Sequence, residues 1–111
     1  MSGITTHVLD TARGRPAAEV VVRLEREIDG AFRPIATSRT DADGRARDLT
    51  GPTIEPGVYR ITFETRAYLE RLGAPVFFPE VAIVFVVADA REHFHVPLLL
   101  SPFGYSTYRG S

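Results

Sequence analysis

Apolar and polar residues alternate with a period of two in short runs between turn residues, which is typical of an antiparallel sandwich or barrel. The clearest run is 58–64, where Tyr59, Ile61 and Phe63 share one face of the expected strand. Asp29-Gly30 predicts a tight hairpin, and Pro34 indicates an edge or a bulge in the returning strand. The expected strands are residues 4–9, 17–27, 32–39, 45–49, 58–64, 81–88, 93–100 and 103–108.

One short helix interrupts the strands. Thr65 is expected to cap a helix over residues 66–72, which Gly73 and Pro75 would end. Prolines recur so often that longer helices are discouraged. We therefore expect an all-β chain with a single short helix.

The run 81–88 is apolar on both faces of its expected strand. A sandwich strand normally keeps one face in water, so the second face is expected to meet another subunit. Cover by a loop or by the short helix is the alternative. At eight residues this is also the longest apolar run, too short to span a bilayer.

Composition narrows the function classes. The 111 residues carry a net charge of −1, which argues against a polybasic nucleic-acid or membrane-surface protein. Without cysteine there are no disulfides and no thiolate metal sites, and without lysine there is no Schiff-base chemistry. The length fits one domain over residues 1–111, and the absence of a secretory signal predicts a cytoplasmic location.

Three histidines are the candidates for acid–base chemistry. His93 and His95 lie two apart, so both project to one face of their strand, while Phe94 and its apolar neighbours form the better core face. A single histidine on a sheet is more often a structural hydrogen-bonding group than a catalyst. His7 lies in mid-strand, where sheet propensity gives no reason for it.

Several separated motifs stand in order along the chain: Thr6-His-Val-Leu-Asp10, Gly14-Arg-Pro16, Thr40-Asp-Ala-Asp-Gly-Arg45, Phe77-Phe-Pro-Glu80, His93-Phe-His-Val-Pro-Leu-Leu-Leu-Ser-Pro102 and Gly104-Tyr-Ser-Thr-Tyr-Arg-Gly-Ser111. They resemble those of the 5-hydroxyisourate hydrolases, the transthyretin-like enzymes of purine catabolism. The resemblance covers essentially the whole chain, although Phe94 and Phe103 stand where many members carry tyrosine.

The resemblance implies a transthyretin-like two-sheet antiparallel sandwich of seven to eight strands with one short helix. It implies a homotetramer, a dimer of dimers with active sites between the dimers, and no metal or organic cofactor. The substrate would be 5-hydroxyisourate and the product 2-oxo-4-hydroxy-4-carboxy-5-ureidoimidazoline, formed when water opens a cyclic amide. Neither nucleic acid nor membrane would be a partner.

The resemblance also implies the site residues. Carried over by motif, the catalytic set is His7, Arg45, His95 and Ser111, the last acting through its hydroxyl or its terminal carboxylate. The substrate-binding set is His7, Arg45, His95, Tyr108, Arg109 and Gly110. Which histidine is the general base, and what His93 does, stay open at this stage.

Two other functions fit parts of the pattern. His-x-His on one strand plus a third histidine is the ligand count of a zinc hydrolase. A non-catalytic carrier of small ligands, as transthyretin itself is, would use the same fold. Against the carrier, transthyretin lacks these histidines, the arginine and the Tyr-Arg-Gly-Ser ending, all of which this chain has.

Overall fold

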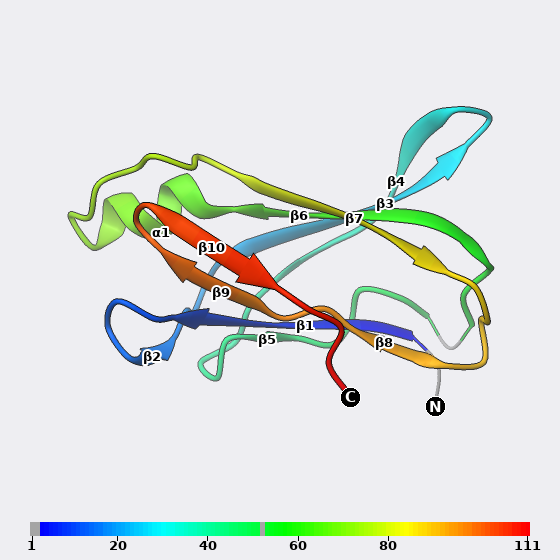
Figure 1. The fold of residues 1–111 in the computed structure, drawn as a ribbon, viewed down its shortest axis with the longest axis horizontal. Coiled ribbons are helices and arrows are strands. Elements are labelled where there is room, and N and C mark those ends of the chain that lie inside the picture. The colour runs from blue at the N-terminus through cyan, green and yellow to red at the C-terminus, as the bar shows by residue number, and fades with distance from the viewer. Residues whose placement is uncertain (1–2, 52) are drawn as a thin grey trace.

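The computed structural model describes residues 3–51 and 53–111, which form two sheets packed face to face (Figure 1). One sheet has the strand order β4 (Ala31–Arg39), β3 (Val21–Ile28), β6 (Gly57–Glu64) and β7 (Val81–Val87). The other runs β10 (Gly104–Thr107), β9 (Leu98–Ser101), β1 (Gly3–Asp10) and β2 (Arg15–Pro16). Two further short strands, β5 (Arg45–Ala46) and β8 (His93–His95), also pair with β1.

The expected sandwich is confirmed, with one correction to its pairing. β1 runs parallel to β8 and β9, whereas every other pair of described strands is antiparallel. Leaving aside the two-residue strands β2 and β5, eight strands are present in the described residues, as expected. Alternation along a strand reports which face is buried but not which neighbour it pairs with, so the parallel pairing was not predicted.

The core lies between the sheets and follows the predicted alternation. Tyr59, Ile61 and Phe63 are buried on β6, and Phe94 is buried on β8. On β7 the two predicted faces differ: Val81 and Val87 reach the core, with Ile83 and Phe85 packed against it, while Val84 and Val86 are 56% and 64% exposed. One apolar face of β7 is therefore uncovered within this chain.

Several strand boundaries differ from the prediction. The strand expected over 17–27 begins only at Val21, because Glu19 adopts a positive φ of 62°. The strand expected over 45–49 has two residues, and the last strand is shorter than 103–108. The strand expected over 93–100 is split at Pro97, which has no N–H to donate, yet the register with β1 is the same on both sides.

The predicted hairpin is confirmed, whereas the start of the helix differs from the prediction. Asp29 and Gly30 both have positive φ between β3 and β4, and β4 is an edge strand with a bulge beside Pro34, as predicted. The helix α1 spans Thr65–Arg71, so Thr65 is its first residue and not its cap. The Thr65 hydroxyl instead donates to the carbonyl of Phe78. No described helix is long and apolar enough to cross a membrane.

Candidate active site

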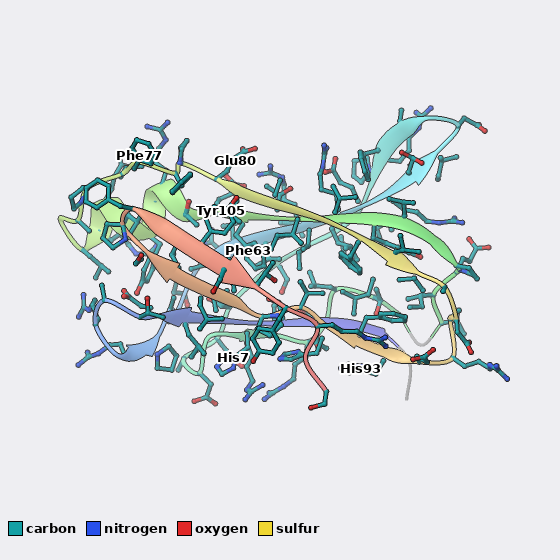
Figure 2. The ribbon with its side chains drawn as sticks, viewed as in Figure 1. His7, Phe63, Phe77, Glu80, His93 and Tyr105 are labelled. Carbon is teal, nitrogen blue, oxygen red and sulfur yellow. The ribbon has the colours of Figure 1, made fainter. Side chains whose placement is uncertain are left out.

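A cavity of about 290 Å³ opens at the sheet that contains β1. Strands β1, β5 and β8, the segment just after β5 and the end of the chain all contribute to the lining of this cavity. The lining residues are Thr5, Thr6, Arg45, Arg47, His93, His95 and Ser111. Figure 2 shows His7 and His93 on this side of the molecule, away from Phe63 in the core. Segments from both ends of the sequence thus meet at one cavity.

The central strand β1 brings the predicted residues together by register. Thr5 lies opposite His95 of β8 in the parallel ladder, and His7 lies opposite Arg45 of β5 in the antiparallel ladder. Thr5 and His7 are two residues apart, so their side chains share one face of β1. His7, Arg45 and His95 are therefore gathered on one face of the sheet, although His7 is not among the residues that line the cavity.

A tight turn holds Arg45 in place. The Asp41 carboxylate accepts hydrogen bonds from the backbone N–H groups of Asp43 and Arg45, at 2.9 and 3.0 Å. These bonds, that from Arg45 above all, hold the pKa of Asp41 below its usual value. Gly44 has a φ of +77°, and a Cβ there would lie 2.4 Å from the Val8 carbonyl oxygen. The sequence Asp-Ala-Asp-Gly thus fixes where β5 starts beside β1.

The guanidinium of Arg45 has no acidic partner in the part of the chain that the structure describes. Arg47, by contrast, lies 3.9 Å from a carboxylate oxygen of Asp41. An arginine that faces a cavity without a carboxylate partner keeps its planar set of donors for a ligand with adjacent oxygens. The cavity therefore suits a small, flat, carbonyl-rich or anionic molecule.

The three histidines differ in their hydrogen bonds. His7 Nε2 lies 2.8 Å from the carbonyl oxygen of Asp43. His93 Nε2 and His95 Nδ1 both contact the hydroxyl of Thr5, at 3.0 and 2.8 Å. Burial lowers the pKa of His95, and the charges of Arg45, His7 and His93 lower it further. Burial and these charges therefore favour the neutral form of His95.

The end of the chain folds back against His95. The backbone N–H of Gly110 donates to the His95 carbonyl at 2.8 Å, and the two residues form an isolated antiparallel bridge. This bridge places Ser111 at the cavity wall. The last residue of the predicted tail therefore lies at the same cavity as His95.

Two predicted substrate-binding residues lie elsewhere. Tyr108 and Arg109 line a second, apolar cavity of about 230 Å³ together with residues of β7 and β8. The Arg109 guanidinium stacks over the Phe94 ring at 4.4 Å and donates to Glu92 Oε1 at 3.0 Å. Arg109 also donates to the backbone carbonyl of His93 at 3.3 Å. Of the predicted tail, only Ser111 lines the histidine cavity in the described residues.

Sequence reasoning missed Thr5 and Arg47, which also line the cavity. Thr5 precedes His7 by two positions and Arg47 follows Arg45 by two. The same strand alternation that predicted the core could have placed Thr5 beside His7. For Arg47 that signal is weaker, because β5 ends at Ala46.

The zinc alternative finds no support in the geometry. Among residues 3–51 and 53–111, no three histidine or carboxylate groups gather closely enough to hold a metal ion. His93 and His95 stack with ring centroids 6.4 Å apart and are joined through the Thr5 hydroxyl. Their nitrogens on that side are thus already in hydrogen bonds.

The fold and the cavity define the chain as an all-β, two-sheet sandwich with a polar cavity lined by histidine and arginine. A model of the HIUase/Transthyretin family matches residues 4–110. The 5-hydroxyisourate hydrolase of Caulobacter vibrioides is 49% identical over 115 residues, with 100% of each chain covered. The chain belongs to the HIUase/Transthyretin family.

Solved structures agree with this assignment. The structure of Klebsiella pneumoniae 5-hydroxyisourate hydrolase matches with a TM-score of 0.89 at 40% identity, covering 100% of both chains. Sea bream transthyretin in complex with thyroxine matches with a TM-score of 0.90 at 33% identity, covering 96% of this chain and 93% of that one. Because a 5-hydroxyisourate hydrolase and a transthyretin with bound thyroxine match this chain equally well, the fold alone does not decide the activity.

Proposed function

We propose that the cavity of His95 and Arg45, with His7 beside it, is where this chain hydrolyses 5-hydroxyisourate. The chain is a hydrolase of urate degradation. Relatives that it matches over all or most of their length are named 5-hydroxyisourate hydrolases, and a longer relative that it matches in part is named a uric acid degradation bifunctional protein. The observation that supports this site is the register of β1 with its neighbours, in which His7 lies opposite Arg45 and Thr5 lies opposite His95. A single domain over residues 1–111 supplies all these groups.

His7 is proposed as the general base. A backbone carbonyl can only accept, so His7 Nε2 carries a hydrogen and donates it to Asp43. In the neutral ring the lone pair then lies on Nδ1, which has no hydrogen-bond partner among the described residues and can take a proton from water. Acid–base catalysis by one positioned histidine contributes about 10²–10⁴-fold in rate.

The reaction follows from these groups. Water loses a proton to His7 Nδ1 as its oxygen bonds to the carbonyl carbon of the cyclic amide. Arg45 donates to the carbonyl oxygen, which becomes an oxyanion in the tetrahedral intermediate. The C–N bond then breaks, the oxyanion collapses to a carboxyl group, and the proton held by His7 passes to the leaving nitrogen. The proposed product is 2-oxo-4-hydroxy-4-carboxy-5-ureidoimidazoline.

The test is a direct assay. Purified protein is mixed with freshly generated 5-hydroxyisourate, and the ultraviolet absorbance is followed against spontaneous decay. We expect faster decay in proportion to protein concentration, with the same rate after treatment with a chelator. Decay at the spontaneous rate, or tight binding without turnover, would reject the hydrolase and favour a carrier.

A homotetramer is proposed as the working assembly. The uncovered apolar face of β7, with Val84 and Val86 more than half exposed, is the support within this chain. Sedimentation should give about four times the chain mass of 12.3 kDa. A monomeric species that is fully active would count against this assembly. The cytoplasmic location stays a prediction of the sequence.

A further inference from the structure

One hydroxyl connects the two histidines of β8. Thr5 Oγ1 lies 3.0 Å from His93 Nε2 and 2.8 Å from His95 Nδ1. The parallel register of β1 and β8 sets Thr5 opposite His95, while His93 stacks on His95 at an interplanar angle of 14°. This contact is not used by the hydrolysis described above.

The Thr5 hydroxyl has one hydrogen, so it can donate to only one of the two rings. It could instead accept from both rings, but its own hydrogen would then have no acceptor among the described residues. Two arrangements keep that hydrogen in a bond to a ring. In one arrangement Thr5 donates to His95 Nδ1 and accepts from His93 Nε2–H. In the other, Thr5 donates to His93 Nε2 and accepts from His95 Nδ1–H. With both rings neutral, the first puts the His95 hydrogen on Nε2, and the second puts it on Nδ1.

The second ring nitrogen of His93, Nδ1, distinguishes these two hydrogen-bond arrangements. His93 Nδ1 is buried and has no hydrogen-bond partner among the described residues. The second arrangement requires a hydrogen there, and a buried N–H without an acceptor is rare and costs about 1–3 kcal/mol. The first arrangement leaves only a lone pair at that position. The geometry therefore favours Thr5 as donor to His95.

We propose that Thr5 and His93 are positioning residues that fix neutral His95 with its hydrogen on Nε2. His95 then meets the substrate as a hydrogen-bond donor, beside Arg45, while His7 is the base. The inference rests on the proposed hydrolysis and gives separate roles to the two histidines of the predicted catalytic set.

The surroundings of His95 agree with a neutral donor. Arg45 of β5, His7 of β1 and His93 of β8 face it, and Ser111 lines the same cavity. A proton added at Nδ1 would make that nitrogen a donor to Thr5 Oγ1. The Thr5 hydrogen would then either lose its acceptor or turn to His93 Nε2, which would move a hydrogen to the buried His93 Nδ1. Protonation of His95 is therefore opposed by its burial, by the nearby charge of Arg45 and by this coupled rearrangement.

The first test compares Thr5→Val, which removes the hydroxyl, with Thr5→Ser, which keeps it. Imidazole ¹⁵N resonances are recorded above the His95 pKa, and kcat and KM are measured. Wild type and Thr5→Ser should show the Nε2–H form of His95, with kcat values within about threefold of each other. Thr5→Val should populate the Nδ1–H form and lower kcat at least tenfold with little change in KM. In serine proteases, a wrong histidine tautomer lowers kcat by about 10⁴.

The matched control is Thr11→Val, because the Thr11 hydroxyl donates to Leu100 O, away from the cavity. It should leave both the His95 resonances and kcat unchanged. If Thr5→Val does not fold, His93→Phe and His93→Gln replace it. Only the Gln side chain keeps an N–H near the position of the His93 Nε2 atom. His93→Gln should therefore retain the Nε2–H form of His95, and His93→Phe should lose it.

The outcomes separate the two proposals. An Nδ1–H resonance for wild-type His95, or full kcat together with an unchanged tautomer in Thr5→Val, overturns the positioning role even when the wild type hydrolyses the substrate. A wild type that shows Nε2–H but does not accelerate decay rejects the proposed function while the tautomer assignment holds.

Discussion

Gly110 lies so close to His95 that no side chain fits between them. A Cβ built at position 110 would be 2.6 Å from His95 Cδ2 and 3.3 Å from Cγ. The Gly110 backbone N–H also donates to the His95 carbonyl. The ring of His95 is therefore held between Thr5 on one side and the glycine of the tail on the other.

Gly110→Ala should lower kcat at least about tenfold, because the His95 ring must move away from Thr5 to admit the methyl group. The melting temperature should change little, since the tail contributes little to the core. Gly104→Ala is the matched control, as a Cβ there meets only Ser101 Oγ at 3.7 Å. Equal turnover in the two variants would show that the contact with His95 does not matter.

Arg45→Ala should lower turnover of 5-hydroxyisourate at least about tenfold without unfolding the protein, because the developing oxyanion loses its donor. His7→Ala and His95→Ala should each do the same. Arg33→Ala, in the β3–β4 hairpin, is the control for removal of an arginine. Steady-state rates and circular dichroism check the prediction, and near-normal rates in the first three variants would reject the assigned roles.

Acidification should destabilise the wild type through His95. Its pKa in the folded chain is lowered from 6.5, so below that pH the unfolded chain binds a proton that the folded chain does not. The free energy of unfolding should therefore fall as the pH drops from about 7.5 to about 5.5, and less steeply in His95→Gln. Urea titrations at each pH measure the two slopes, and parallel slopes would contradict the lowered pKa.

Tyr68→Phe should destabilise the fold by about 1.5–3 kcal/mol and leave turnover unchanged. The Tyr68 hydroxyl donates to the buried carboxylate of Asp10 at 2.6 Å, and burial together with this bond raises the pKa of Tyr68. Without the Tyr68 hydroxyl, the one donor to the Asp10 carboxylate among the described residues is the backbone N–H of Arg13, at 3.0 Å. Tyr105→Phe is the control, since its hydroxyl has no hydrogen bond among the described residues. Denaturant midpoints that coincide for the two variants would argue against the buried bond.

Local patterns predicted the elements better than their pairing. Alternation at Tyr59, Ile61 and Phe63 was enough to place the β6 core face, because burial of one face follows a period of two. Thr65 shows the limit, since its hydroxyl bonds to Phe78, thirteen residues away, instead of capping its own helix. A side chain that has a distant partner cannot be assigned from its neighbours alone.

By itself, the sequence determined most of the strands, their buried faces, the hairpin at Asp29-Gly30 and, through its motifs, the family. It also proposed the catalytic set of His7, Arg45, His95 and Ser111, which stays a prediction. Only the tertiary structure decided that β1 pairs in parallel with β8, which brings Thr5 to His95 and Gly110 against its ring. Strand alternation and turn geometry are set by adjacent residues. Register between strands some ninety positions apart is set by how the whole core packs, so the partner of each imidazole appears only in the folded chain.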